Sequence, residues 1–144
     1  MKLYLDTSAL KRPFDDQFQP RIALETEAVV TVLAMIQGRE ASLMTSSILE
    51  YENSRNPQME RRRWTSQVLH LAISRQSLTA ATQHRAATLE SQGLKPLDAL
   101  HVACAEMGHA DQFLTCDDHL LRHYRGTLSV LNQVQFILNL SKKS

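Results

Sequence analysis

Four acidic side chains occur where predicted strands end or where predicted helices present an inward face. They are Asp6, Glu52, Asp98 and Asp117. Like charges that a fold brings together raise each other's pKa, so such a cluster needs protons or cations. Carboxylate oxygens without paired His or Cys ligands select hard cations. The four acids therefore predict a site for Mg²⁺ or Mn²⁺ if the fold gathers them.

A carboxylate metal site suits the hydrolysis of a phosphodiester. The substrate is anionic and repels hydroxide, so a metal ion helps by neutralising the phosphate and lowering the pKa of a bound water. The carboxylates hold the metal and orient or deprotonate the attacking water. Four acids can hold one ion, or two ions roughly 3.5 to 4 Å apart, and the sequence leaves both arrangements open.

Each acid also has a structural alternative. Asp6 and Asp117 can cap the turns that follow them, and Asp98 can cap a helix. Glu52 can be a surface charge. Single residues do not decide between these alternatives, so the prediction depends on all four reaching one place.

Glu50 is a second candidate for the helical acid. Residues two apart on a helix point about 200° from each other, so Glu50 and Glu52 cannot both face the site. Ile48 and Glu52 are four apart and share a helix face. Because that face buries Ile48, the register favours Glu52 as the site residue.

Short apolar runs alternate with helical patterns along the whole chain. Strands are predicted at 3–5, 41–45, 113–115 and 128–131. Helices are predicted at 20–37, 45–55, 57–73, 79–93, 96–107, around 120–121 and at 134–140, with a polar loop at 11–16. Strands separated by helices indicate an α/β sandwich with a mostly parallel sheet, whose strand ends place ligands.

Length and composition narrow the class of protein. The 144 residues fit one domain at 1–140, followed by a frayed tail at 141–144. A net charge of +1 is not that of a strongly basic nucleic-acid binder, so any such partner must be held locally. Met1 leads directly into the first strand, and no apolar run approaches the roughly 18 residues of a membrane span. A cytoplasmic protein without a membrane partner is predicted.

The two cysteines indicate no metal site and no disulfide. Cys104 and Cys116 are far apart and follow no paired spacing. They are typical of small apolar residues in a reduced compartment.

Four segments, taken together, resemble the PIN domain family of VapC-type toxins and related small metal-dependent ribonucleases. They are LDTSAL at 5–10, SSILEYENSRNP at 46–57, KPLDALHVACAE at 95–106 and FLTCDDHLL at 113–121. The resemblance covers nearly the whole chain. It implies a three-layer α/β/α sandwich around a parallel sheet, with an acidic pocket that binds Mg²⁺ or Mn²⁺ and cleaves RNA.

The resemblance also implies roles and partners. The catalytic and metal-binding acids of the family fall on Asp6, Glu52, Asp98 and Asp117. Ser8 and Thr115 match the hydroxyls that accompany those acids, and Asp118 is an additional acid without an assigned role. Homodimers are expected, together with a small antitoxin protein that covers the acidic pocket.

Three other functions fit the sequence less well than RNA hydrolysis does. A receiver-like Mg²⁺-binding signalling module would have adjacent acids early in the chain, but Asp6 has no acidic neighbour. A phosphatase that forms an aspartyl-phosphate would have a second Asp two positions later, where Ser8 stands. The third alternative is a PIN-fold protein-binding subunit without catalysis, against which the intact acids argue.

Basic and histidine side chains give weaker signals. Lys11 and Arg12 follow Asp6 and are candidates for phosphate contacts, whereas the run 61–63 fits a solvated helix face better. His101 lies three residues after Asp98 and is interpreted as a hydrogen-bonded structural histidine.

Overall fold

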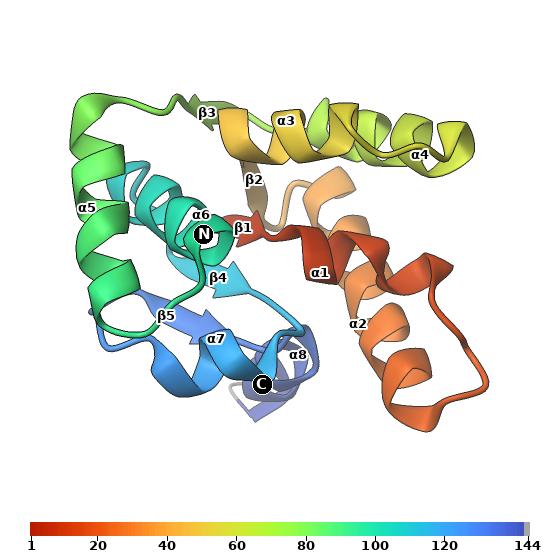
Figure 1. Ribbon diagram of the computed structural model, residues 1–144. Coiled ribbons are helices and arrows are strands. Elements are labelled where there is room, and N and C mark those ends of the chain that lie inside the picture. Colours follow the sequence, from red (N-terminus) through yellow and green to blue (C-terminus); the bar gives the residue numbers. More distant parts are fainter. Residues whose placement is uncertain (143–144) are drawn as a thin grey trace.

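The protein is described by a computed structural model over residues 1–142. Its centre is a parallel sheet of five strands in the order β3-β2-β1-β4-β5 (Figure 1). The strands are β1 (Lys2–Leu5), β2 (Ser42–Ser46), β3 (Ser74–Gln76), β4 (Gln112–Leu114) and β5 (Ser129–Leu131). The helices are α1 (Thr7–Lys11), η1 (Arg12–Phe14), α2 (Pro20–Gln37), α3 (Ser47–Ser54), α4 (Met59–Leu69), α5 (Ala80–Ser91), α6 (Pro96–Met107), α7 (Asp118–His123) and α8 (Gln133–Lys142).

Strand β1 occupies the middle of the sheet because its side chains are apolar on both faces. Leu3, Tyr4 and Leu5 are at most 1% exposed, as expected for a strand covered on both sides. Leu3 pairs with Leu43 of β2, and Tyr4 pairs with Phe113 of β4. The carboxyl ends of β1, β2 and β4 therefore meet at one edge of the sheet.

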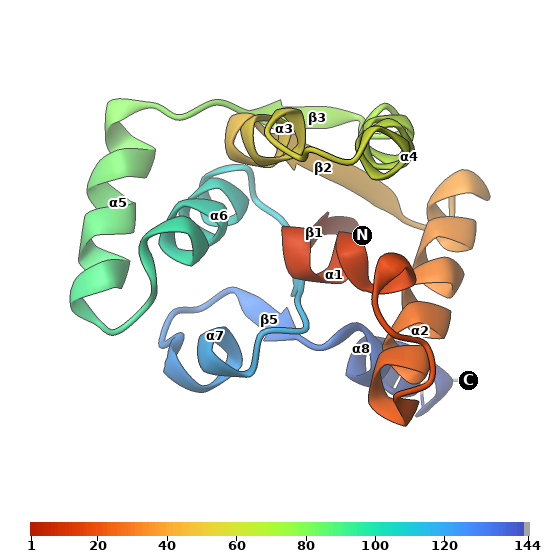
Figure 2. The same cartoon turned by 45° about the vertical axis from the view of Figure 1, so that its right-hand side comes forward.

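Helices cover both faces of the sheet, which confirms the three-layer α/β/α fold. Figure 2 shows α5 and α6 on one side and α2 on the other, with α8 packed beside α2. Pro20 and Pro96 begin α2 and α6, where a missing N–H costs nothing, and Gly38 and Gly108 follow their last turns.

Two predictions about the elements were wrong. The predicted helix over 57–73 is shorter, because α4 ends at Leu69 and Ser74–Gln76 forms the edge strand β3. This strand carries no apolar residue, so no periodicity marks it. The predicted polar loop over 11–16 is largely helical, because the Asp6 side chain caps α1 and η1 continues to Phe14.

The C-terminal helix is longer than predicted, and both cysteines are buried. Helix α8 continues to Lys142, so two residues of the expected frayed tail are helical, and 143–144 lie outside the described residues. Cys104 and Cys116 are buried free thiols, and burial raises the pKa of each to about 11. Within 1–142, the helices are too short or too polar to cross a bilayer.

Candidate active site

The four predicted acids line one cavity at the carboxyl edge of the sheet. The cavity has a volume of about 350 Å³. Its lining consists of Asp6, Thr7, Ser8, Glu52, Lys95, Pro96, Leu97, Asp98, His101 and Asp117. The acids come from four places in the chain: the end of β1, the middle of α3, the first turn of α6 and the loop after β4.

Asp6 is held by hydrogen bonds from both sides of the sheet edge. One carboxylate oxygen accepts from Ser8 Oγ at 2.7 Å and from the Ala9 backbone N–H at 3.0 Å. The other accepts from Thr115 Oγ1 at 2.6 Å. Asp6 is 3% exposed, and burial raises its pKa even though the two hydroxyls oppose the shift. Asp6 thus caps α1 and also faces the cavity.

Asp98 and Asp117 both line the cavity and lie near each other. Asp117 caps α7 by accepting from the backbone N–H groups of His119 and Leu120 at 2.9 and 3.3 Å. Asp98 lies in the first turn of α6, where the helix dipole favours a negative charge. Burial and the neighbouring carboxylates of Asp117 and Asp6 nevertheless raise the pKa of Asp98 to about 6. The acids are therefore close enough to repel one another.

Glu52 meets the cavity from α3, whereas Glu50 does not. Glu52 Oε1 accepts from Thr7 Oγ1 at 2.9 Å and from His101 Nε2. Burial raises the pKa of Glu52, but these two donors outweigh it and leave the pKa below its usual value. Glu50 pairs with Arg75 at 2.9 Å and lines a separate cavity of about 600 Å³ between α3 and α4.

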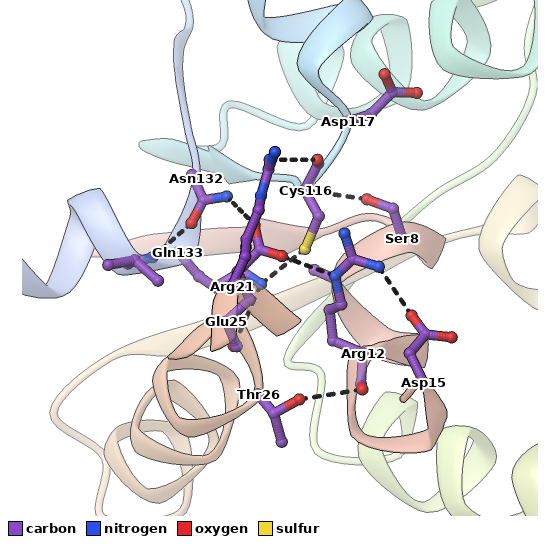
Figure 3. Close-up of polar contacts among 12 residues, drawn as sticks. Ser8, Arg12, Asp15, Arg21, Glu25, Thr26, Cys116, Asp117, Asn132 and Gln133 are labelled. Atoms are coloured by element: carbon purple, nitrogen blue, oxygen red, sulfur yellow. Dashed lines mark hydrogen bonds and ion pairs between the residues drawn. The ribbon is translucent and has the colours of Figure 1, made fainter. Parts of the chain in front are cut away.

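An ionic network around the buried Glu25 supports the loop that carries Asp117. Figure 3 shows Glu25 of α2 between Arg12, Arg21 and Asn132, with the Asp117 carboxylate pointing away from this group. Arg12 Nε donates to Glu25 at 2.8 Å and Arg21 Nε donates at 3.2 Å. Arg21 also reaches the Cys116 carbonyl at 3.4 Å, and its guanidinium pairs with Asp118 at 2.7 Å. The network joins α2 to the chain on either side of Asp117.

The structure changes the expected roles of the basic side chains. Arg12 pairs with Glu25 and Asp15, and its contact with phosphate stays a prediction. Lys11 is exposed and lines a small cavity of about 110 Å³ that borders the acidic one. Lys95, which the sequence argument passed over, lines the acidic cavity itself. Its place directly before Pro96 and three residues before Asp98 was the available signal.

The acids suit a hard divalent cation by their chemistry. Asp6, Asp98 and Asp117 offer oxygen donors, and burial together with the neighbouring carboxylates raises the pKa of Asp98, a shift that a bound cation would oppose. Within residues 1–142, however, the structure contains no group of three or more His, Cys, Asp or Glu side chains close enough to enclose an ion.

The raised pKa of Asp98 predicts a pH dependence of stability. Between the ordinary value of 3.8 and about 6, the folded state binds more protons than the unfolded state. The free energy of unfolding therefore falls as the pH rises through this window. We expect Asp98→Asn to remove that fall and, without divalent metal at neutral pH, to stabilise the protein by about 1 kcal/mol, after allowance for partial exposure.

Urea denaturation in EDTA, at about pH 4 and about pH 7, measures this difference. The two proteins should have similar stability at the lower pH and separate at the higher one. An Asp98→Asn variant that loses stability at neutral pH would contradict the repulsion among the acids.

Comparison with known proteins identifies one family and several solved structures of similar fold. Residues 3–126 match the family model of the PIN domain. FitAcB from Neisseria gonorrhoeae is similar with a TM-score of 0.58 and 17% identity, over 91% of this chain and 97% of that one. VapBC2 from Rickettsia felis, solved with a DNA fragment from its promoter, has a TM-score of 0.60 and 17% identity, over 92% and 98%.

A third similar structure is VapC20 from Mycobacterium tuberculosis, a toxin that cleaves the sarcin-ricin loop. Its TM-score is 0.55 at 14% identity, over 88% of this chain and 98% of that one. At such identities these structures establish a shared fold. No curated protein matches the sequence.

Proposed function

The chain belongs to the PIN domain family, and on that premise we propose that it is a metal-dependent ribonuclease that hydrolyses RNA phosphodiester bonds. The proposed metal ligands and catalytic groups are Asp6, Glu52, Asp98 and Asp117, with Mg²⁺ or Mn²⁺ as cofactor. The observation that carries the proposal is that these four acids, distant in sequence, line one cavity at the sheet edge. The cleavage of RNA by VapC20, a toxin of similar fold, supports the choice of substrate.

The chain's own residues prepare the site for an anionic substrate. Hydrogen bonds from Ser8 and Thr115 orient Asp6, and the first turn of α7 orients Asp117. Their remaining lone pairs stay available to the cavity. Lys95 adds a positive charge on the cavity wall, which attracts the RNA phosphate.

Asp6, Asp98 and Asp117 would hold the cation, which would neutralise the phosphate charge and increase the acidity of a water molecule. The carboxylates then have to orient the attacking water and receive its proton. Glu52 suits this task because its carboxylate lines the cavity and is held through Oε1 by Thr7 and His101.

Cleavage assays test the proposal directly. We expect the purified protein to cut RNA in Mg²⁺ or Mn²⁺ and to lose this activity in EDTA, with recovery when either ion is restored. Cleavage that persists unchanged in EDTA would rule out the mechanism. Acetyl phosphate and a phosphate monoester, the substrates expected of a receiver module and of a phosphatase, should remain unreacted. Sequencing of the RNA ends after induction in cells would identify the RNA and the bond that is cut.

Two partners belong to the same proposal. VapBC2 and FitAcB, which share the fold, support a role as the toxin of a toxin-antitoxin pair. We propose a small antitoxin protein that covers the acidic cavity, and self-association into a homodimer in a cytoplasmic setting. Light scattering at tens of micromolar, a concentration that reveals weak association, checks the dimer; a strict monomer would remove it.

A further inference from the structure

We infer that His101 is a positioning residue, whose ring holds the Glu52 carboxylate so that one oxygen is fixed and the other stays free for the cavity. The catalytic consequence of this arrangement rests on the proposed ribonuclease function. The geometry itself does not, because it depends only on the contacts of four buried or half-buried side chains.

A hydrogen-bonded chain crosses the molecule behind the acidic cavity. It begins at Ser46, where β2 ends, and Ser46 Oγ lies 2.7 Å from Tyr4 Oη. Tyr4 Oη lies 2.6 Å from His101 Nδ1, and His101 Nε2 contacts Glu52 Oε1. Ser46 and Tyr4 are fully buried and His101 is 2% exposed, so no solvent replaces a lost partner. The chain thus joins β2, β1, α6 and α3.

The Glu52 carboxylate determines which nitrogen of His101 carries a hydrogen toward it. An ionised carboxylate only accepts hydrogen bonds, so His101 Nε2 must carry a hydrogen and donate it to Glu52. At the other end of the ring, Nδ1 lies within hydrogen-bond distance of the Tyr4 hydroxyl, which in turn contacts the Ser46 hydroxyl. Ser46 in turn accepts from the Leu49 backbone N–H at 3.2 Å. Both ring nitrogens of His101 and the hydroxyls of Tyr4 and Ser46 therefore each have a partner.

Both contacts to Glu52 go to the same oxygen. Thr7 Oγ1 donates to Oε1 at 2.9 Å, and His101 Nε2 donates to Oε1 as well. Among residues 1–142, no hydrogen bond to Oε2 is found, although Glu52 lines the cavity. Oε2 is therefore the atom left for a water molecule or a cation. Rotation of the carboxylate would break both hydrogen bonds, from Thr7 and from His101, so the carboxylate stays in this orientation.

Packing prevents the histidine ring from turning. The Tyr4 ring stacks on Phe113 with centroids 5.0 Å apart and meets His101 edge to face at 5.8 Å. A turned His101 ring would leave buried polar groups of Tyr4 and Glu52 unpaired, which is costly in a dry interior. The position of Glu52 therefore depends on β1 and β4 as well as on its own helix.

A matched pair of variants separates the two ends of the ring. The amide of His101→Gln reaches the place of Nε2 and can still donate to Glu52. The shorter amide of His101→Asn reaches only the place of Nδ1 and loses Glu52. We expect His101→Asn to lower kcat for RNA about tenfold without a change in KM, the range seen when a partner of a metal ligand is lost. We expect His101→Gln to stay within about threefold.

Two further measurements distinguish positioning from general stability. In a double-mutant cycle, His101→Asn should cost little further activity in a Glu52→Gln background, because Glu52→Gln has already removed from the cavity the carboxylate that His101 positions. Nitrogen-15 NMR of metal-free protein should find His101 Nε2 protonated. Additive losses in the cycle, equal losses for His101→Asn and His101→Gln, or an unprotonated Nε2 would each overturn the inference.

The outcomes separate this inference from the proposed function. If wild-type protein cleaves RNA and His101→Asn is unimpaired, the inference fails and the ribonuclease stands. If wild-type protein cleaves no RNA with either metal, the proposed function fails. In that case the NMR spectrum still decides whether His101 donates to Glu52.

Discussion

Glu52→Gln is expected to reduce metal-dependent RNA cleavage about a hundredfold or more, the upper range for loss of a metal-site partner. The reason lies in the two donors at Oε1. Because Thr7 and His101 both require an acceptor there, the amide oxygen takes that place and the amide NH₂ replaces Oε2 at the cavity. An amide NH₂ carries no negative charge and cannot accept a proton or bind a cation.

Glu50→Gln is the matched control, since it makes the same change two residues away on α3. Glu50 is 40% exposed and pairs with Arg75 outside the acidic cavity. We expect its activity to remain within about threefold of wild type, as for an ordinary surface change. Both variants are measured at saturating Mn²⁺, with thermal unfolding to verify that they fold. The reverse order of activities would put Glu50 in the site.

Glu25→Ala is expected to lower the free energy of unfolding by about 3 to 5 kcal/mol, the loss typical when one partner of a buried ion pair is removed. Glu25 is 2% exposed and accepts from Arg12, Arg21 and Asn132. Without the Glu25 carboxylate, Arg12 retains its ion pair with Asp15, but its Nε loses its acceptor in a half-buried position. Urea denaturation measures the loss.

An exposed ion pair provides the comparison for Glu25. Arg75 and Glu50 are 50% and 40% exposed, so breaking their contact should cost at most about 1 kcal/mol. Glu25→Ala should also weaken RNA cleavage, because Arg21, which donates to the Glu25 carboxylate, also contacts the Cys116 carbonyl beside Asp117. If Glu25→Ala lowers the free energy of unfolding no more than Glu50→Gln does, the ion pairs of Glu25 do not hold α2 to the loop that carries Asp117.

The amino-acid sequence by itself determined the features that depend on near neighbours. The apolar run at 3–5 specified a strand buried on both faces, and Pro20 and Pro96 marked helix starts. The convergence of the acids could also be predicted, because the carboxyl ends of neighbouring parallel strands meet at one edge of the sheet. The helix period alone separated Glu52 from Glu50, because residues two apart face different sides.

Only the tertiary structure decided features that join distant parts of the chain. The strand β3 has no apolar signal and forms because β2 offers it a partner edge. The sequence does not indicate that Arg12 pairs with Glu25, because only the packing of α2 places Glu25 beside it. His101 and Tyr4 are 97 residues apart, and their contact requires the register of β1 and the placement of α6. Such pairings depend on how elements pack, which a local pattern does not encode.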